Sequence, residues 1–127
     1  MRYLGLDWGE KNIGVAVSDE EESISVPFTV LKGDDWDDLI NDIGNIIRRE
    51  RICEIVIGIP LTLEGKESVK AKQVRVFASN LEKYFNLPMH FEDERLTSRM
   101  ASQDHSQAAS YILQSFLDAK RYIDTTP

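Results

Sequence analysis

The sequence contains one cysteine and no long hydrophobic run, and each of these absences excludes a class of protein. A membrane-spanning helix needs about 18 or more consecutive apolar residues, which no segment supplies. Asp7 interrupts the first apolar segment where a secretory signal peptide would continue, so we expect a cytoplasmic protein that is neither secreted nor inserted in a membrane. A lone thiol also fits a reducing compartment. Because Cys53 stands in the apolar run 52–57, we expect it to be buried and unreactive.

Basic residues are also scarce, since 15 Lys and Arg stand against 22 Asp and Glu and the net charge is −7. Non-specific nucleic-acid binding comes from cations that neutralise phosphates, so this balance argues against binding of that kind. A local basic face is still open to the chain. The basic residues in the middle of the sequence are Lys66, Lys70, Lys72 and Arg75. With 127 residues, 42% of them hydrophobic, the chain can bury one core, and we expect a single domain over residues 1–127.

Hydrophobic periodicity predicts an opening run of strands followed by alternating helices and strands. Polar segments at 8–11 and 19–23 separate the first three strands. The first helix has Asp34 or Asp35 available as its N-cap, and the apolar run 55–59 is typical of a central strand. The predicted elements are strands 2–7, 12–19 and 24–31, a helix over 36–50, strand 55–59, a helix over 74–85, strand 89–91 and a last helix over 109–117.

Few architectures accommodate this order of elements. Right-handed crossovers place the first strand beside the fourth, so we expect an α/β fold with a five-stranded mixed sheet in the order 3-2-1-4-5 and helices on both faces. The strand order reverses beside the first strand. In open α/β sheets, ligands bind outside the carboxyl ends of the strands at such a reversal, which points to Asp7.

Acidic residues end two of the predicted strands. Asp7 ends the first, where its carboxylate either accepts hydrogen bonds from the following turn or belongs to a site. Glu92, Asp93 and Glu94 end the fifth, and since alternate residues of a strand face the same way, the two glutamates should share one side. The first and fifth strands are two spacings apart, roughly 10 Å, and a Glu side chain is long enough to help to close that gap.

The start of the last helix carries Asp104 and His105. The apolar stripe of that helix is centred close to the direction of His105, so we expect His105 to face the sheet and Asp104 to cap the helix. An inward histidine is either a hydrogen-bonded core residue or a ligand. Carboxylates and an imidazole at one rim would suit Mg²⁺ or Mn²⁺, and such ions serve phosphodiester hydrolysis among other reactions.

Four blocks of sequence span nearly the whole chain. They are LGLDWGEKNIGVAVSD at 4–19, VIGIP at 56–60, DERLTS at 93–98, and AA at 108–109 with ILQSFLD at 112–118. In this order they resemble the YqgF/RuvX family, described both as pre-16S ribosomal RNA nucleases and as Holliday-junction-resolvase-like proteins. The resemblance implies an RNase H-like fold and a nuclease, dependent on Mg²⁺ or Mn²⁺, that processes the 5′ end of precursor 16S rRNA.

The family pattern also implies a set of site residues. Its first two acids match Asp7 and Glu94. Its third acid stands eight residues before the Leu of the Ile-Leu-Gln motif, where this sequence departs from the pattern and has His105. A neutral imidazole is an acceptable ligand for Mn²⁺ and a poorer one for Mg²⁺. The resemblance therefore implies that Asp7, Glu94 and His105 hold the metal and carry the catalysis.

The family usually carries a longer basic stretch between the second acid and the last helix, and here only residues 96–103 follow Arg95. We therefore expect phosphate contacts from basic residues that flank the rim, with precursor 16S rRNA, free or in ribosomal particles, as the favoured partner. The expected contacts are Lys66, Lys70, Arg75, Arg99 and Arg95, of which Arg95 could instead neutralise one of the acids that end the fifth strand. The sequence leaves the oligomeric state open between monomer and homodimer.

Other functions remain open at this point. A non-catalytic nucleic-acid-binding or ribosome-assembly factor could keep the fold while His105 replaces a required acid. A DNA resolvase of the Holliday-junction type would cut two strands and would ordinarily need a symmetric dimer. Residues 6–9 also resemble the phosphate loop of actin-like ATPases and sugar kinases, but those proteins clamp their nucleotide between two such domains.

Overall fold

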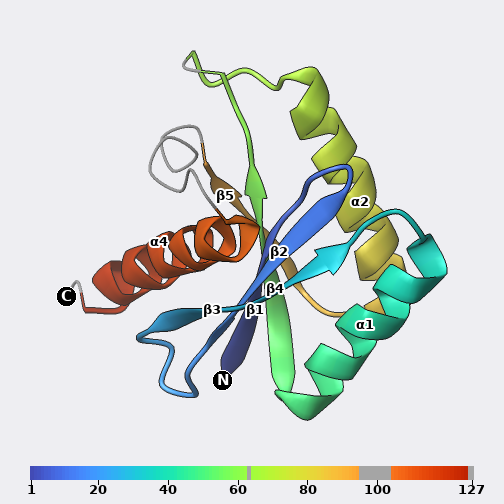
Figure 1. Ribbon diagram of the computed structural model, residues 1–127. Helices are drawn as coiled ribbons and strands as arrows, with labels where there is room; N and C mark the ends of the chain where they lie inside the picture. Colours follow the sequence, from blue (N-terminus) through green and yellow to red (C-terminus); the bar gives the residue numbers. More distant parts are fainter. Residues whose placement is uncertain (63, 95–103, 126–127) are drawn as a thin grey trace.

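The computed structural model describes residues 1–62, 64–94 and 104–125, with side chains described as far as Tyr122. Strands and helices follow one another in the predicted order (Figure 1). The elements are β1 (Arg2–Asp7), β2 (Asn12–Ser18), β3 (Ser25–Lys32), α1 (Trp36–Arg49), β4 (Ile52–Ile59), α2 (Val69–Phe85), β5 (Met89–Asp93) and α4 (His105–Thr125).

The strands form one five-stranded sheet in the order β3-β2-β1-β4-β5, which confirms the predicted topology. β1 pairs antiparallel with β2 and parallel with β4, and β5 extends the parallel part of the sheet. In the register of β4 and β5, Gly58 pairs with Glu92 and Ile59 with Asp93. The carboxyl ends of β1, β4 and β5 therefore meet at one edge of the sheet.

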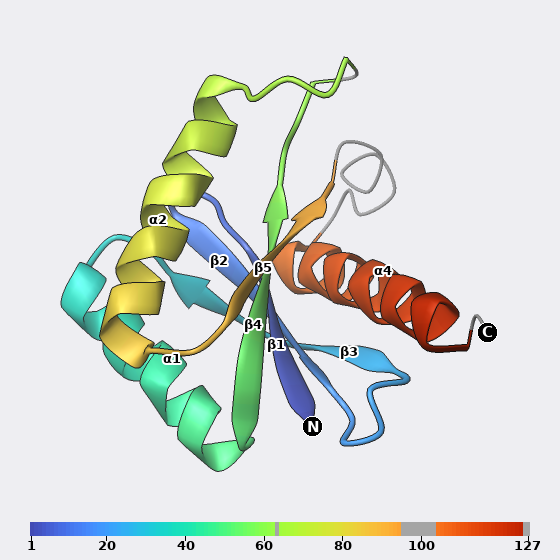
Figure 2. The ribbon, with the colours of Figure 1, turned by 180° about the vertical axis from the view of Figure 1, so that it is seen from behind.

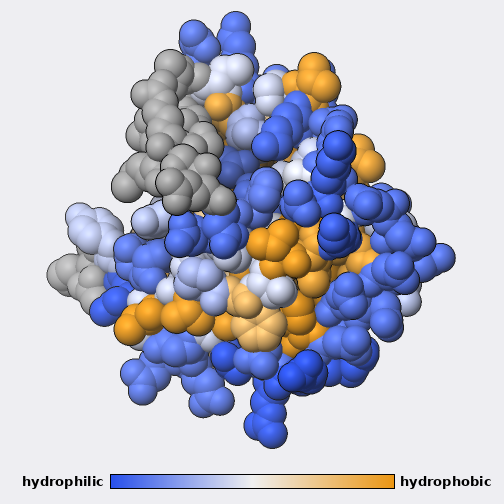
Figure 3. All heavy atoms as spheres, viewed as in Figure 1, coloured by the Kyte–Doolittle hydropathy of each residue, from blue (hydrophilic) through white to orange (hydrophobic). Residues whose placement is uncertain are grey.

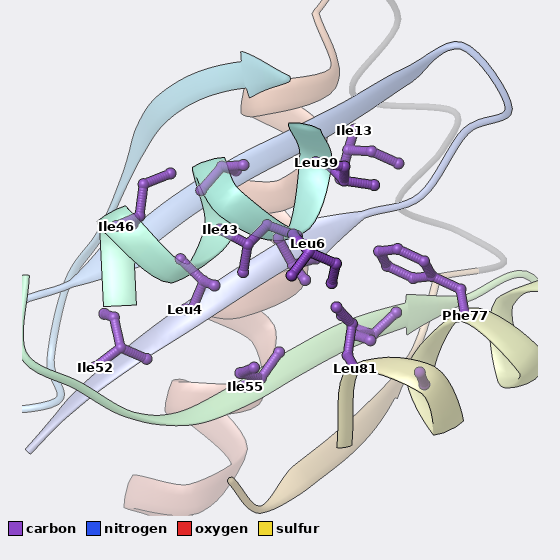
Figure 4. Packing of buried hydrophobic residues seen from close by; sticks show 14 of the residues in the cluster. Leu4, Leu6, Ile13, Leu39, Ile43, Ile46, Ile52, Ile55, Phe77 and Leu81 are labelled. Atoms are coloured by element: carbon purple, nitrogen blue, oxygen red, sulfur yellow. The ribbon is translucent and has the colours of Figure 1, made fainter. Parts of the chain in front are cut away.

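Helices cover both faces of the sheet, as predicted, with α1 and α2 on one face and α4 on the other (Figures 1 and 2). The side chains of β1 alternate between these layers: Leu4 and Leu6 join the α1 and α2 layer, and Tyr3 packs with residues of α4. Figure 4 shows Leu4 and Leu6 among buried side chains contributed by the neighbouring strands and helices. Burying each such side chain stabilises the fold by about 1.5–3 kcal/mol.

Side-chain caps fix where the helices begin. Asp35 caps α1 by accepting a hydrogen bond from the backbone N–H of Asp38, and Ser68 caps α2 through the N–H of Ala71. α2 starts earlier than the predicted helix, because Ser68 caps a first turn in which lysines alternate with Val69 and Ala71 and hide the helical pattern. Asp104 accepts hydrogen bonds from the backbone and hydroxyl of Ser106, as expected of a cap for α4.

α4 lies unusually close to the sheet because a glycine faces its first turn. A Cβ added at Gly14 in β2 would come within 1.9 Å of the carbonyl oxygen of His105, so only glycine fits beneath this turn. Further along, Gln114 accepts a hydrogen bond from the N–H of Ser25 and donates to the carbonyl of Ser23. The β2–β3 connection is therefore fastened to α4, and the start of the helix is set against β2.

β3 is an edge strand with partly uncovered apolar side chains. Val26, Phe28 and Val30 keep 48%, 42% and 40% of their surfaces exposed. Figure 3 shows apolar residues gathered in the middle of this view, with hydrophilic residues around them. Pro27 interrupts the strand and has no N–H to offer, which makes this edge a poor template for pairing with another chain.

The prediction that Cys53 is buried is wrong, because its side chain is exposed. Arg2 pairs with Ile52 and Tyr3 with Glu54, so Cys53 is an extra residue at an irregularity between β1 and β4. An unpaired residue of this kind leaves the regular alternation of inward and outward side chains. Within the described residues, no helix is long and apolar enough to cross a lipid bilayer.

Candidate active site

Two buried acids and a histidine come together at the carboxyl edge of the sheet. Asp7 is the last residue of β1 and is 7% exposed, and Glu94 directly follows β5 and is 4% exposed. His105 is the first residue of α4, whose first turn lies against β2. Charged side chains are rarely buried to this extent unless they are paired or functional, so the position of both carboxylates calls for an explanation.

Glu94 reaches Asp7 across the intervening strand β4. Its backbone N–H donates a hydrogen bond to the carbonyl of Ile59 at 3.1 Å, which continues the pairing of β5 with β4. A Cβ added at Gly58 would lie 3.0 Å from Oε2 of Glu94 and 2.4 Å from Cδ1 of Ile112. The missing side chain at Gly58 therefore leaves the space in which the Glu94 carboxylate lies.

The prediction that Glu92 and Glu94 share one face of the sheet is confirmed. Oε2 of Glu92 accepts a hydrogen bond from the hydroxyl of Ser115 on α4 at 2.8 Å. The Glu94 carboxylate lies on the same face, since it shares its surroundings with Ile112 of α4. Glu92 thus sits on the α4 face beside the site and is engaged with the helix.

The environment of Glu94 favours its protonated form. Burial is the main cause, and the charge of Asp7 with a side-chain hydrogen bond between the two acids adds to it, so that the pKa of Glu94 rises to about 7. The charge of Lys70 on α2 acts in the opposite direction and lowers this pKa. A second negative charge beside Asp7 is therefore disfavoured, and a cation bound at the pair would relieve that repulsion.

His105 is bound to Asp7 from the other side. Nδ1 of His105 lies 3.0 Å from Oδ2 of Asp7, which confirms that the histidine faces the sheet and contacts the acid. Its side chain is 43% exposed, so the rest of the ring is open to solvent. If Nδ1 carries the proton, it donates to the carboxylate and Nε2 is left as an acceptor at the surface.

The side chains at this rim match part of what a divalent cation requires. Two buried carboxylates in contact supply the hard oxygen ligands that Mg²⁺ and Mn²⁺ prefer, and a bound cation would offset the repulsion that raises the pKa of Glu94. Across the described part of the chain, no three His, Cys, Asp or Glu side chains are arranged to hold a metal ion. The residues fit a cation held by Asp7 and Glu94, with His105 engaged by Asp7.

The basic residues expected to bind phosphate lie at different distances from this rim. Lys70 is close enough for its charge to act on Glu94. Lys66 is exposed in the connection between β4 and α2, and the Arg75 guanidinium is paired with Glu67 and stacked 4.8 Å from the centre of the Phe91 ring. Arg95 and Arg99 fall outside the described residues.

A hollow of about 410 Å³ opens beside the acids. Sequence reasoning missed it, because its lining comes from the β1–β2 turn, the first turns of α2 and the start of α4. Side chains in this lining include Trp8, Lys11, Asn12, Lys70, Gln73 and His105. Gly58 and Gly14 were also missed as positioning residues, although a glycine inside a strand is a known sign of close approach by another group.

A mixed sheet of this order, with α4 on one face and acids at the reversal of strand order, defines an RNase H-like fold. Solved resolvases share it. RuvC of Thermus thermophilus in complex with a Holliday junction has a TM-score of 0.59 at 12% identity, over 95% of this chain and 96% of that one. A Fowlpox virus resolvase bound to Holliday junction DNA has a TM-score of 0.57 at 11% identity, over 94% and 99%.

The chain belongs to the family whose model is described as "RuvX: Holliday junction resolvase", which matches residues 1–119. Curated relatives include a "Putative pre-16S rRNA nuclease" of Maridesulfovibrio salexigens, 35% identical over 92% of this chain and 98% of the relative. A protein with the same description from Dictyoglomus turgidum is 35% identical over 94% and 95%. The resemblance seen in the four sequence blocks is thereby confirmed.

Proposed function

We propose that this chain is a nuclease that hydrolyses phosphodiester bonds in precursor 16S rRNA, acting in the cytoplasm as one domain over residues 1–127. The observation that carries the proposal is the buried pair of Asp7 and Glu94 at the reversal of strand order. Two crowded carboxylates cost stability and are typical of a site that holds a cation. The names of the family's curated relatives support the choice of RNA as substrate.

In this proposal, Asp7 and Glu94 would hold Mg²⁺ or Mn²⁺. A divalent cation at such a site supplies positive charge to the phosphate oxygens and lowers the pKa of water. His105 keeps the Asp7 carboxylate in place through Nδ1, and its exposed Nε2 can accept or return a proton at the rim. Lys70 lies beside Glu94, where its ammonium group can bind a phosphate oxygen.

Cleavage of a labelled RNA carrying the precursor 16S 5′ extension, in Mg²⁺ and in Mn²⁺, tests the proposal. We expect metal-dependent cutting that falls by at least about 10³-fold in Asp7→Asn, since the variant loses a charged ligand. Asp42→Asn is the matched control, because Asp42 is exposed on α1 and belongs neither to the carboxylate pair nor to the lining of the hollow beside it. A preference for Mn²⁺ would support His105 as a further ligand.

A four-way DNA junction in the same assay separates this proposal from its alternatives. Cutting of the junction in preference to the RNA would replace RNA by branched DNA as the substrate. If folded wild-type protein cuts neither substrate in either metal, the nuclease proposal fails and a non-catalytic assembly factor takes its place.

A further inference from the structure

The hollow beside His105 has the lining of a site for part of a nucleotide. We propose that it binds the base and sugar of the nucleotide next to the scissile phosphate, an inference that rests on the proposed nuclease function. Its volume of about 410 Å³ lies within the range of small-molecule sites in proteins. The hollow would thus select which nucleotide flanks the cut.

Two residues of the lining connect the hollow to the carboxylate pair. His105 lines the hollow and is bound to Asp7 at 3.0 Å. Lys70 also lines it, and its charge acts on Glu94. A phosphate placed between Lys70 and the two acids would therefore have its neighbouring sugar at the entrance of the hollow.

The remaining lining suits the neutral part of a nucleotide. The indole of Trp8 offers an aromatic surface and is held by the ring of Phe77, whose centroid is 6.4 Å away. The amides of Asn12 and Gln73 both donate and accept hydrogen bonds, as the edge of a base requires. Glu10 and Lys11 also line the hollow, and their opposite charges offset each other.

Gln73→Ala tests the site with little risk to folding, because Gln73 is exposed on α2. The matched control is Asn80→Ala, another exposed amide on the same helix but outside this hollow. We expect Gln73→Ala to raise KM for RNA cleavage by about fivefold, since one hydrogen bond to the substrate is lost, and to change kcat by less than about twofold. Asn80→Ala should keep the wild-type KM.

Abasic substitution then shows which nucleotide occupies the hollow. Fluorescein-labelled RNAs, each with one abasic position, are titrated into Asp7→Asn protein with and without Gln73→Ala, and binding is followed by anisotropy. At one position beside the cut, loss of the base should weaken binding about tenfold. That penalty should shrink by about fivefold when Gln73 is already alanine, because the same contact has been removed.

The cleavage assay and the abasic titration test the proposed function and this inference separately. If wild-type protein cuts RNA but the abasic penalty is equal with and without Gln73 at every position, the nucleotide site is wrong and the nuclease stands. If the penalty shrinks at one position but no metal supports cutting, the hollow binds a nucleotide, but the nuclease proposal and the placement of that nucleotide beside a scissile phosphate are wrong. A KM of Gln73→Ala equal to that of Asn80→Ala also overturns the inference.

Discussion

The two ends of the sheet beneath α4 differ in the partners of their acidic side chains. At the amino end, two acids have basic partners: Glu54 is paired with His90, and Oε1 of Glu22 lies 2.8 Å from Nζ of Lys120. At the carboxyl end, Asp7 has His105 as its partner, but Glu94 is buried against Asp7 itself. A fold optimised for stability alone would not place two carboxylates together in its interior. The amino end therefore stabilises the molecule, and the carboxyl end gives up stability for a site.

Tyr3 and Glu94 lie on the same face of the sheet, and their pKa values show the difference between its two ends. Burial and the negative charges of Glu54 and Glu22 raise the pKa of Tyr3 to about 12, so this phenol stays neutral throughout the physiological range. Burial raises the pKa of Glu94 to about 7, so its charge changes within the physiological range. We therefore expect substitutions at the carboxyl end to abolish activity, and substitutions at the amino end to lower stability alone.

The largest effect is expected when α4 is moved away from the carboxyl end of the sheet. In Gly14→Ala, the new methyl group would overlap the carbonyl oxygen of His105, so the first turn of α4 has to shift. We expect a loss of about 3 kcal/mol in the free energy of unfolding, measured with urea, and loss of cleavage because His105 leaves Asp7. Gly44→Ala on α1 is the control, since its Cβ would meet neighbours only at 3.4 Å. Equal stability of the two variants would contradict this account of α4.

Removing the charge of Glu94 should raise the stability of the metal-free protein and abolish cleavage. The folded protein holds a proton on Glu94 that the unfolded chain releases above pH 4.5, so metal-free stability should fall as pH rises from about 4.5 to about 7. Glu94→Gln should abolish that fall and stabilise metal-free protein at pH 8 by about 2 kcal/mol, while cleavage is lost. Urea unfolding between pH 5 and pH 8 measures both effects. Glu92→Gln, whose carboxylate is engaged with Ser115, should keep the wild-type slope.

The smallest effect is expected at the amino end. Glu54→Gln weakens a partly buried pair with His90. The free energy of unfolding at pH 7 should therefore be about 1 kcal/mol lower than in the wild type. Cleavage below the melting transition should stay at the wild-type rate, because the substitution lies at the far end of the strands. Glu82→Gln on the exposed side of α2 serves as the stability control. A loss of activity in Glu54→Gln without loss of stability would mean that the two ends are coupled.

Much of this arrangement could be predicted from the sequence because it depends on periodicity. The apolar pattern determined the element order, and the crossover rule then left one strand order, in which Asp7 stands at the reversal. The alternation along β5 placed Glu92 and Glu94 on one face, and the helical stripe turned His105 toward Asp7. Each of these inferences needed only the repeat of a strand or a helix.

What could not be predicted depends on contacts between distant segments. The exposure of Cys53 follows from an irregular pairing of β1 with β4, which no pattern within 52–57 reveals. The Glu94 carboxylate lies over Gly58 only because of the register in which β5, β4 and β1 pair, and the sequence does not show that register. The hollow beside His105 is built from three segments, and the partners of Arg75 are Glu67 and Phe91 instead of the rim. The roles of Asp7, Glu94 and His105 in catalysis remain predictions for the experiments above.

The order of the segments along the chain adds a consequence for synthesis on the ribosome. All five strands precede α4, so a nascent chain that has formed its sheet still exposes the apolar side chains of Tyr3, Val56 and Ala16 on one face. Folding of the N-terminal part first is the usual course during translation. His105 reaches Asp7 only when α4 docks over this face, and an unfinished chain therefore emerges beside ribosomal RNA with its site incomplete.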